Sequence, residues 1–488
     1  MLNLVPLLCG LIGLLVSFIY FSWIKKVGKN TNKNEHLIQH SAEEKIFYRT
    51  EWMTIIIVVI VLSVVIGIAL DWVSSIVYIY GAMVSVATEI VGSHILNVGK
   101  RKFEIFIGED SQLFKIGFRS GAGAGLFMAS AGLLTLGAIF VPLNLTTTIS
   151  CIACYGFGVS TIILFNDTKF IEAADFFESY VATLMSAVIL AKFAVNTSHI
   201  TSTFNVKTAA VYPLIIAGAG LIASIIGNLF VRRKDRGNIS IRINIGAYVT
   251  AILLVLISIF LSVNMLQSYV YAIALALGII CGLITGLNAV NNTALVPVLA
   301  FAASFILSYK FVGTYGLALD AVGFTSMTSF LIATSSYGLV TETNSNIGKV
   351  ADGYATCSSA LAVLALFVAY TQAANINSIN ITDPNILVGL FIGVMMPIAY
   401  ASIFNNEKLN NENLNFIMKL TSFLLPGIVG MLFGAESLGA FLGGLITAGM
   451  VTSYESSDTS SINSMIKYMT AFALVFSPVF VKFGGILY

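Results

Sequence analysis

Two acidic residues, Asp175 and Glu178, lie in the stretch AADFFESYV (173–181), directly before the apolar run ATLMSAVILA (182–191). Residues three apart lie on the same face of a helix, so the two carboxyl groups are predicted to point the same way. A charged side chain at the centre of a bilayer costs about 3 kcal/mol or more. Two acids beside a membrane segment therefore indicate a site where they are paired with a cation, neutral or hydrated.

The composition indicates a membrane protein. Of 488 residues, 57% are hydrophobic and 10% are charged, and many apolar stretches approach the roughly 20 residues that a helix needs to cross a bilayer. The formal net charge is +2, and the basic residues form short clusters between apolar segments, which argues against a nucleic-acid partner. The sequence predicts an all-α polytopic membrane protein with a single transmembrane domain over residues 1–488.

The hydrophobic pattern predicts about sixteen transmembrane helices. Their expected ranges are 3–24, 52–70, 72–96, 119–142, 146–166, 172–194, 208–231, 240–263, 267–288, 290–309, 312–335, 354–373, 385–404, 415–433, 434–454 and 460–483. Most of the 25 Lys and Arg residues fall in the loops that follow odd-numbered helices. Because basic loops stay in the cytoplasm, both termini are expected outside. The long polar loop 25–51 is interpreted as a solvated hairpin or a helix extension.

Three short patterns are interpreted as structural. Cys151 and Cys154 form a CxxC inside an apolar run, with no second Cys pair or histidine near them in the sequence, so we expect packing residues and no metal site. GAGAG (121–125) lies within an apolar stretch, where small residues let helices approach closely. The first apolar stretch, 4–24, is too long for a signal peptide and is predicted to be a transmembrane helix.

Two further acids fall inside apolar runs. Asp320 lies in GLALDAVG and Glu89 lies in SVATEIVG. Each is interpreted as a polar contact between helices, and Glu89 could instead contact a partner protein.

Several stretches resemble the membrane-bound pyrophosphatases, ion pumps that couple pyrophosphate hydrolysis to H⁺ or Na⁺ export. AADFFESYVATLMSAVILA (173–191) is similar to the GADLFESYV helix of that family, and VYPLIIAGAGLIASIIGNLFVRR (211–233) is similar to its seventh helix. Further similar stretches follow in the family's order, among them GYATCSSALAVLALFVAY (353–370) and GAESLGAFLGGLITAG (434–449). The resemblance implies sixteen helices in an inner and an outer ring, outside termini and a homodimer.

The motifs that bind Mg²⁺ in that family are largely missing here. Pyrophosphate hydrolysis needs several Mg²⁺ ions, and Mg²⁺ needs clustered oxygen ligands. The family supplies them from repeated aspartate motifs such as DVGADLVGK and DNVGDNVGD, whereas this chain has only NDTKFIE (166–172) where the family has a long acidic insertion. Its nine aspartates are scattered along the sequence. Loss of hydrolysis is therefore expected, with no catalytic residue, no metal site and no cofactor, and with Mg²⁺ only if hydrolysis is retained.

The resemblance also implies an ion gate. In the family, an aspartate and a glutamate of the DLFESY helix, a lysine of the last helix and an arginine after the fifth helix form this gate. Asp175, Glu178 and Lys467 match three of these positions, and the arginine position corresponds to Asn166 or Asp167. Two interpretations remain open. The three residues are either a remnant ion pair that joins two helices or part of a working ion path.

Three functions are compatible with the sequence. The first is a catalytically degenerate homologue that acts as a structural, partner-binding or regulatory membrane subunit with a remnant ion gate. The second is a passive or secondary ion transporter, and the third is a pyrophosphate-energised H⁺ or Na⁺ pump with an unusual active site. In each case we expect an integral protein of the cell (inner) membrane. Its expected partners are the lipid bilayer, a second copy of the chain and possibly another membrane protein, without nucleic acid.

Overall fold

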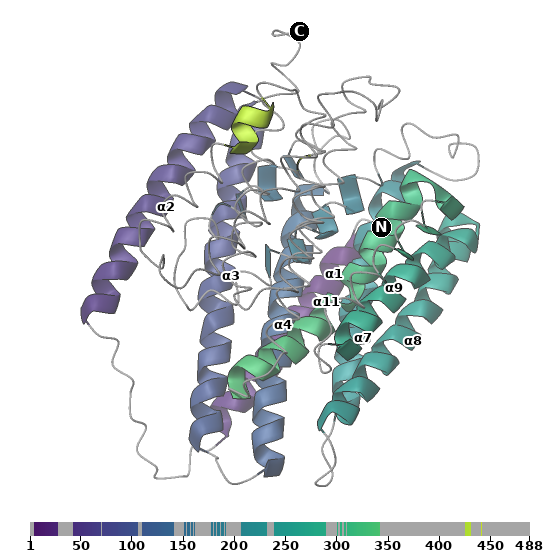
Figure 1. The fold of residues 1–488 in the computed structure, drawn as a ribbon, viewed down its shortest axis with the longest axis horizontal. Coiled ribbons are helices and arrows are strands. Elements are labelled where there is room, and N and C mark those ends of the chain that lie inside the picture. The colour runs from purple at the N-terminus through teal and green to yellow at the C-terminus, as the bar shows by residue number, and fades with distance from the viewer. Residues whose placement is uncertain are drawn as a thin grey trace, which may run out of the picture.

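The fold was obtained as a computed structural model. It describes residues 4–27, 42–69, 71–105, 110–140, 206–231, 239–288 and 310–341, together with short pieces between 151 and 191, between 300 and 308, and between 425 and 441. Within this part the chain forms a bundle of long helices (Figure 1). These are α1 (Val5–Lys26), α2 (Ala42–Ala69), α3 (Trp72–Ile105), α4 (Asp110–Phe140), α7 (Val206–Phe230), α8 (Ile239–Leu266), α9 (Val270–Asn288) and α11 (Thr314–Thr341).

The helix α11 is surrounded by other helices. It packs against α4, α9 and α7, and every residue of its apolar stretch Tyr315–Thr334 is buried. Each of these three neighbours contacts the main chain of α11 through a glycine, and the contacts join Gly125 of α4 to Ser329, Gly220 of α7 to Ser326 and Gly278 of α9 to Asp320. Small residues at such crossings let helix backbones approach closely inside a membrane.

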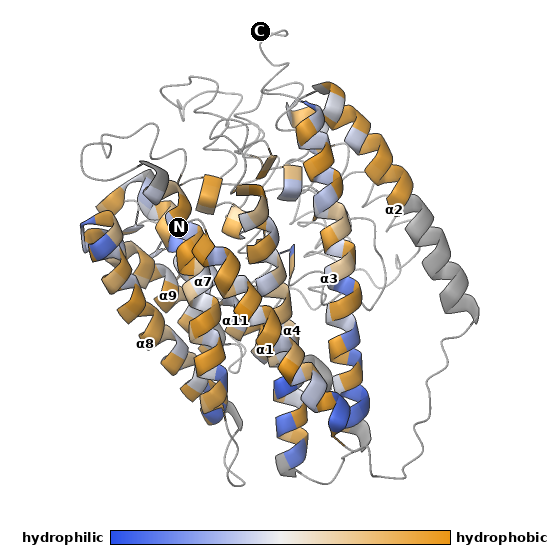
Figure 2. Cartoon of the chain, turned by 180° about the vertical axis from the view of Figure 1, so that it is seen from behind, coloured by the Kyte–Doolittle hydropathy of each residue, from blue (hydrophilic) through white to orange (hydrophobic). Residues whose placement is uncertain are grey.

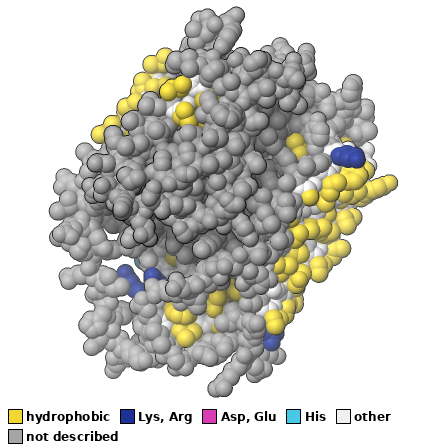
Figure 3. Space-filling view, viewed as in Figure 1, with side chains coloured by type: hydrophobic (Ala, Val, Ile, Leu, Met, Phe, Trp, Pro, Cys, Tyr) yellow, Lys and Arg dark blue, Asp and Glu magenta, His cyan; other side chains and the backbone are white. Residues whose placement is uncertain are grey.

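The outer helices expose apolar side chains. Six described helices are long and apolar enough to cross a membrane, and α8 carries exposed side chains such as Phe260, which is 66% exposed. Hydrophobic residues cover most of the length of the helices in Figure 2, and hydrophilic residues gather at one end of α3 and α4. In Figure 3 a band of hydrophobic side chains runs along the side where Figure 1 places α8, with basic side chains at its ends. An apolar side with polar ends fits a lipid bilayer.

The ends of α1, α3 and α4 that carry basic residues meet at one end of the bundle. The guanidinium of Arg119 lies 4.0 Å from the ring centre of Trp23, and Nζ of Lys25 lies 4.3 Å from that of Phe21. Lys100, Arg101 and Lys102 belong to the end of α3, where Figure 2 shows hydrophilic residues. The basic residues after the first and third predicted transmembrane helices thus lie on the same side, as the predicted topology requires.

Helix α3 begins at a side-chain cap. The Asp71 carboxylate accepts hydrogen bonds from the main-chain N–H of Ser74 (2.7 Å) and from the Ser74 hydroxyl (2.9 Å). The Ser75 hydroxyl donates to the main-chain oxygen of Ser63 at 2.6 Å, which joins α3 to the end of α2. An aspartate at this position satisfies an N–H group that has no partner within the helix.

Removal of this cap tests its contribution to stability. Asp71→Ala is expected to lower the free energy of unfolding by about 1 kcal/mol, because the Ser74 N–H loses its acceptor. Asp71→Asn keeps an acceptor oxygen and should stay close to the wild type. Unfolding of both variants in detergent measures the difference. An equal loss in the two variants would show that hydrogen bonding at the cap is not the cause.

The predicted helices agree with the described ones in position and differ at their ends. Helix α2 begins at Ala42, inside the predicted loop 25–51, so part of that loop is a helix extension. Helix α4 begins at Asp110, before the predicted residue 119, and α3 continues to Ile105, past residue 96. These additions mix charged and polar residues with apolar ones, among them the buried Phe114, Ile116 and Phe118 of α4. The predicted number of sixteen is not confirmed, because most of the chain after residue 341 lies outside the described part.

The short patterns have the structural roles predicted for them. The GAGAG run lies inside α4, where Gly125 faces the main chain of α11. Cys151 and Cys154 are buried in the main hydrophobic core. The first apolar stretch forms α1.

Candidate functional site: the segment around Glu178

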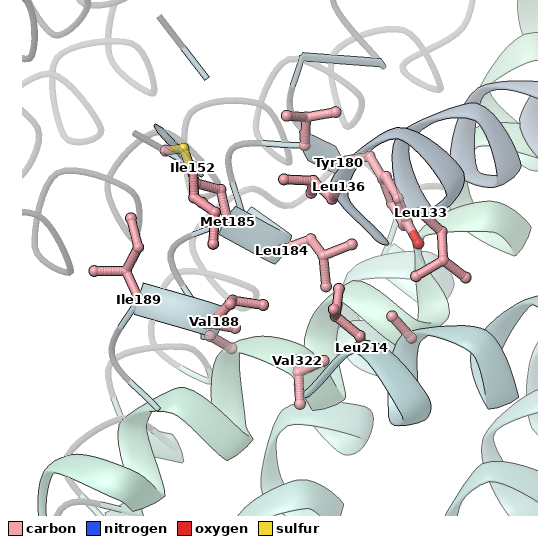
Figure 4. Close-up of a cluster of buried hydrophobic side chains, with 14 of the residues drawn as sticks. Leu133, Leu136, Ile152, Tyr180, Leu184, Met185, Val188, Ile189, Leu214 and Val322 are labelled. Atoms are coloured by element: carbon pink, nitrogen blue, oxygen red, sulfur yellow. The ribbon is translucent and has the colours of Figure 1, made fainter. Parts of the chain in front are cut away.

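The segment that carries Glu178 lies in the core of the bundle. Figure 4 shows its apolar side chains between those of α4, α7 and α11. The buried side chains of this cluster include Leu133, Leu136, Tyr180, Leu184, Val188, Leu214 and Val322. Because the neighbours come from three separate helices, the position of this segment is fixed by packing on several sides.

Two glycines let neighbouring helices approach this segment. A Cβ atom added at Gly132 of α4 would lie 2.8 Å from the Tyr180 ring, and one added at Gly156 would overlap the sulfur of Met185. Real Cβ contacts are longer than this, so both glycines are needed for the observed packing. The short piece 154–156 is joined in turn to α4, because the hydroxyl groups of Tyr155 and Thr135 form a hydrogen bond.

Glu178 is buried among these contacts. Its side chain is 9% exposed, and its neighbours Phe177 and Tyr180 are 0% and 1% exposed. A buried carboxylate needs a cation or hydrogen-bond donors, and otherwise it takes up a proton. The Glu178 side chain is thus largely withdrawn from lipid and from water. This position suits either a structural ion pair or an ion-binding group.

The other predicted gate residues lie outside the described part. Asp175, Lys467 and the two candidates for the arginine position, Asn166 and Asp167, are among the residues that the structure does not describe. Their grouping with Glu178 therefore stays a prediction.

The described residues do not gather acids as Mg²⁺ would require. Within the part of the chain that the structure describes, no group of three His, Cys, Asp or Glu side chains could hold a metal ion. Hard cations such as Mg²⁺ take oxygen ligands, chiefly carboxylates in proteins. The described acids thus do not fit the cluster that pyrophosphate hydrolysis uses.

A second buried acid, Asp320, has a partner that sequence reasoning missed. Asp320 is 2% exposed, and its Oδ2 accepts a hydrogen bond from the Ser304 hydroxyl at 3.1 Å. The two residues belong to neighbouring helical segments joined by a turn at Gly313, whose φ of +72° favours glycine. Ser304 and Ser308 are spaced four apart and are both buried. In the sequence, this spacing places two serines on one helix face, and it could have indicated a polar face that contacts Asp320.

The fold and the buried acids define a polytopic α-helical membrane protein with ionisable groups inside its core. The family model described as inorganic H⁺ pyrophosphatase matches residues 11–168, 171–288 and 343–407. The chain belongs to this family. The gap in the match between residues 168 and 171 falls inside NDTKFIE, where the sequence predicted a missing insertion.

Three relatives of this chain carry the names of pyrophosphate-energised ion pumps. The chain is 23% identical to a putative K⁺-stimulated pyrophosphate-energised sodium pump of Clostridium tetani, over 98% of each chain. It is 23% identical to a K⁺-insensitive pyrophosphate-energised proton pump of Methanosarcina mazei, over 91% of this chain and 87% of the relative. A similar proton pump of Moorella thermoacetica is 25% identical over 80% of this chain and 75% of the relative.

The length of the first alignment shows what this chain lacks. It extends over 670 positions, whereas this chain has 488 residues. The Clostridium tetani protein therefore contains segments that have no counterpart here. The missing acidic insertion at residues 166–172 is expected to be one of them.

Proposed function

We propose that this protein is a catalytically degenerate membrane pyrophosphatase that acts as a structural, partner-binding or regulatory membrane subunit with a remnant ion gate. The observation that carries the proposal is the short connection NDTKFIE (166–172), which stands where the family has a long acidic insertion. Without that insertion the chain lacks carboxylates that would hold Mg²⁺ and pyrophosphate. The packed segment around Glu178 supports retention of the membrane scaffold.

A second candidate is a pyrophosphate-energised H⁺ or Na⁺ pump with an unusual active site. It is favoured by the names of the three relatives, each of which is a pyrophosphate-energised pump. In this case Mg²⁺ and pyrophosphate would bind to residues outside the family's aspartate motifs. The two candidates differ in ligand binding, so one experiment separates them.

Pyrophosphate binding is the property to measure. A ligand that binds only the folded state raises its stability by about 2.7 kcal/mol at 100 times its dissociation constant. We expect no rise in the melting temperature of the purified protein with Mg²⁺ and imidodiphosphate, and no phosphate release from pyrophosphate. The Methanosarcina mazei proton pump, treated identically, is the positive control. Stabilisation of this protein together with phosphate release would support the pump and refute the degenerate homologue.

A further inference from the structure

Asp320 lies inside the bundle at membrane depth. It is the seventh residue of α11, about two turns from the helix start, and its side chain is 2% exposed. Because α11 is covered by α4, α7 and α9, the carboxyl group is shielded from lipid as well as from water. The side chain therefore depends on protein groups for any stabilisation of its charge.

The contacts of this carboxyl group are few. Oδ2 accepts the hydrogen bond from the Ser304 hydroxyl, and Oδ1 is buried without a hydrogen-bond partner in the described part of the chain. Oδ1 faces the main chain of α9 at Gly278. A Cβ atom added at this glycine would lie 2.9 Å from Oδ1. The carboxyl group of Asp320 thus lies between α9 and the segment of Ser304. Both pack closely against it, which leaves little space for further ligands.

Charged residues of the surrounding helices do not reach it. Helix α9 contains no Asp, Glu, Lys, Arg or His, and Asp320 is the sole charged residue of α11. The other titratable side chains of α9 and α11 are Tyr271, Cys281, Tyr315 and Tyr337, and the rings of Tyr271 and Tyr315 are in edge contact. The charged and histidine residues of the remaining neighbours are Asp110, Lys115 and Arg119 in α4, Lys207 in α7, Arg242 in α8, Glu89, His94, Lys100, Arg101, Lys102 and Glu104 in α3, and the exposed Lys310 beside the hairpin turn. Asp320 forms no ion pair with any of them.

The cost of burying a charge and the gain from hydrogen bonding together favour the neutral form of the Asp320 carboxyl group. A bare carboxylate at this depth costs about 3 kcal/mol or more. One hydrogen bond to a charged group returns only about 1.5–3 kcal/mol. A bound metal cation would need several oxygen ligands, and the described surroundings add a single hydroxyl. Uptake of a proton removes the charge with no further ligand.

We propose that Asp320 is an intramembrane proton-binding site. Its carboxylate takes a proton from water to form a neutral carboxylic acid, with Oδ2 still accepting from the Ser304 hydroxyl. The site is separate in sequence from the predicted gate of Asp175, Glu178 and Lys467. It does not rest on the degenerate or the pump function, because it follows from the packing of α9, α11 and the segment of Ser304 alone.

Infrared spectroscopy of the full chain in liposomes tests the protonation directly. The carbonyl stretch of a protonated carboxyl group is separate from the stretches of a carboxylate and shifts in D₂O. At neutral pH we expect one carboxylic-acid band to be present in the wild type and lost in Asp320→Asn. Asp71→Asn is the matched control. Asp71 is exposed and distant in sequence, so this substitution should leave the band assigned to Asp320 in place.

A second variant reports on the same group without altering it. Ser304→Ala removes the hydroxyl donor, so the Asp320 band should shift to higher frequency while persisting, which also covers the case in which Asp320→Asn does not fold. Labelling with ¹³C-aspartate assigns the band to aspartate. The proposal is overturned if a folded wild type shows no aspartic-acid band that depends on residue 320 or 304. It is equally overturned if Na⁺ or K⁺ converts the band to a carboxylate, because the site would then bind a metal cation.

Discussion

Lys467→Met is expected to lower the free energy of unfolding by about 3–5 kcal/mol, because it would leave the carboxyl groups of Asp175 and Glu178 without their cation. The burial of Glu178, at 9% exposed, is the structural reason for a loss of this size. A smaller loss is expected where one of the two acids takes up a proton, since two carboxylates that share a site do not both remain charged. Unfolding in detergent, compared with the wild type at the same pH, measures the effect.

A triple replacement of Asp175, Glu178 and Lys467 by apolar residues of similar size is the matched control. Its stability should be close to that of the wild type or higher, because the cost of burying the charges disappears together with their attraction. A severe single variant and a mild triple variant would identify a structural ion pair. If Lys467→Met changes neither stability nor ion flux, the three residues do not form one cluster.

Ion flux distinguishes the structural pair from a working ion path. Liposomes that contain each variant are placed under an imposed ion gradient, and the rate of its decay is recorded. For a remnant ion pair, the triple variant and the wild type should have equal rates. A folded triple variant that loses flux shown by the wild type would instead assign the three residues to an ion path.

Gly278→Ala is expected to lower the free energy of unfolding by about 3 kcal/mol. The added methyl group would overlap the main-chain oxygen of Asp320 and approach its Oδ1 to 2.9 Å. A backbone atom cannot turn aside as a flexible side chain can, so α9 and α11 must separate and lose packing along the crossing. Gly282, one turn further on α9, packs against Met327 of α11, where an added Cβ atom would lie 2.9 Å from the Met327 Cβ, and this contact would be lost as well.

Gly123→Ala is the control for the helix position itself. At this glycine of α4, the nearest atom to an added Cβ is Cβ of Tyr20 at 3.4 Å, which is ordinary contact. Alanine is favoured over glycine inside a helix by about 1 kcal/mol, so Gly123→Ala should be neutral or slightly stabilising. Comparable losses in the two variants would mean that the close crossing of α9 and α11 does not determine stability.

The positions of the helices could be predicted because each apolar stretch is long. The ends could not, because α2 and α4 begin at Ala42 and Asp110, in segments of mixed polarity that precede their long apolar stretches. Hydropathy measures how well a segment tolerates lipid, whereas a helix end depends on local hydrogen bonds such as the Asp71 cap. The large apolar stretches thus define where helices lie, and single polar groups define where they stop.

The candidate site could be predicted only in part. The spacing of Asp175 and Glu178 predicts a common helix face, which stays a prediction because Asp175 lies outside the described residues, and Glu178 is buried in the structure. The contact between Ser304 and Asp320 could not be derived, because it depends on how a hairpin turns at Gly313. Sequence spacing describes neighbours on one helix, whereas contacts between helices depend on their rotation. The burial of α11 among α4, α7 and α9 likewise depends on how each helix is rotated about its own axis.

Helix α11 also constrains how the chain enters the membrane during synthesis. It is the least hydrophobic of the six described candidate spans, while α8, largely exposed, is the most hydrophobic. A segment rich in Gly, Ser and Thr gains little from lipid and is held in place by protein contacts. Its three principal neighbours, α4, α7 and α9, all precede it in the sequence. The surface that these three helices form for α11 is therefore synthesised before α11 itself, and a truncation before residue 314 would leave that surface without the helix that covers it.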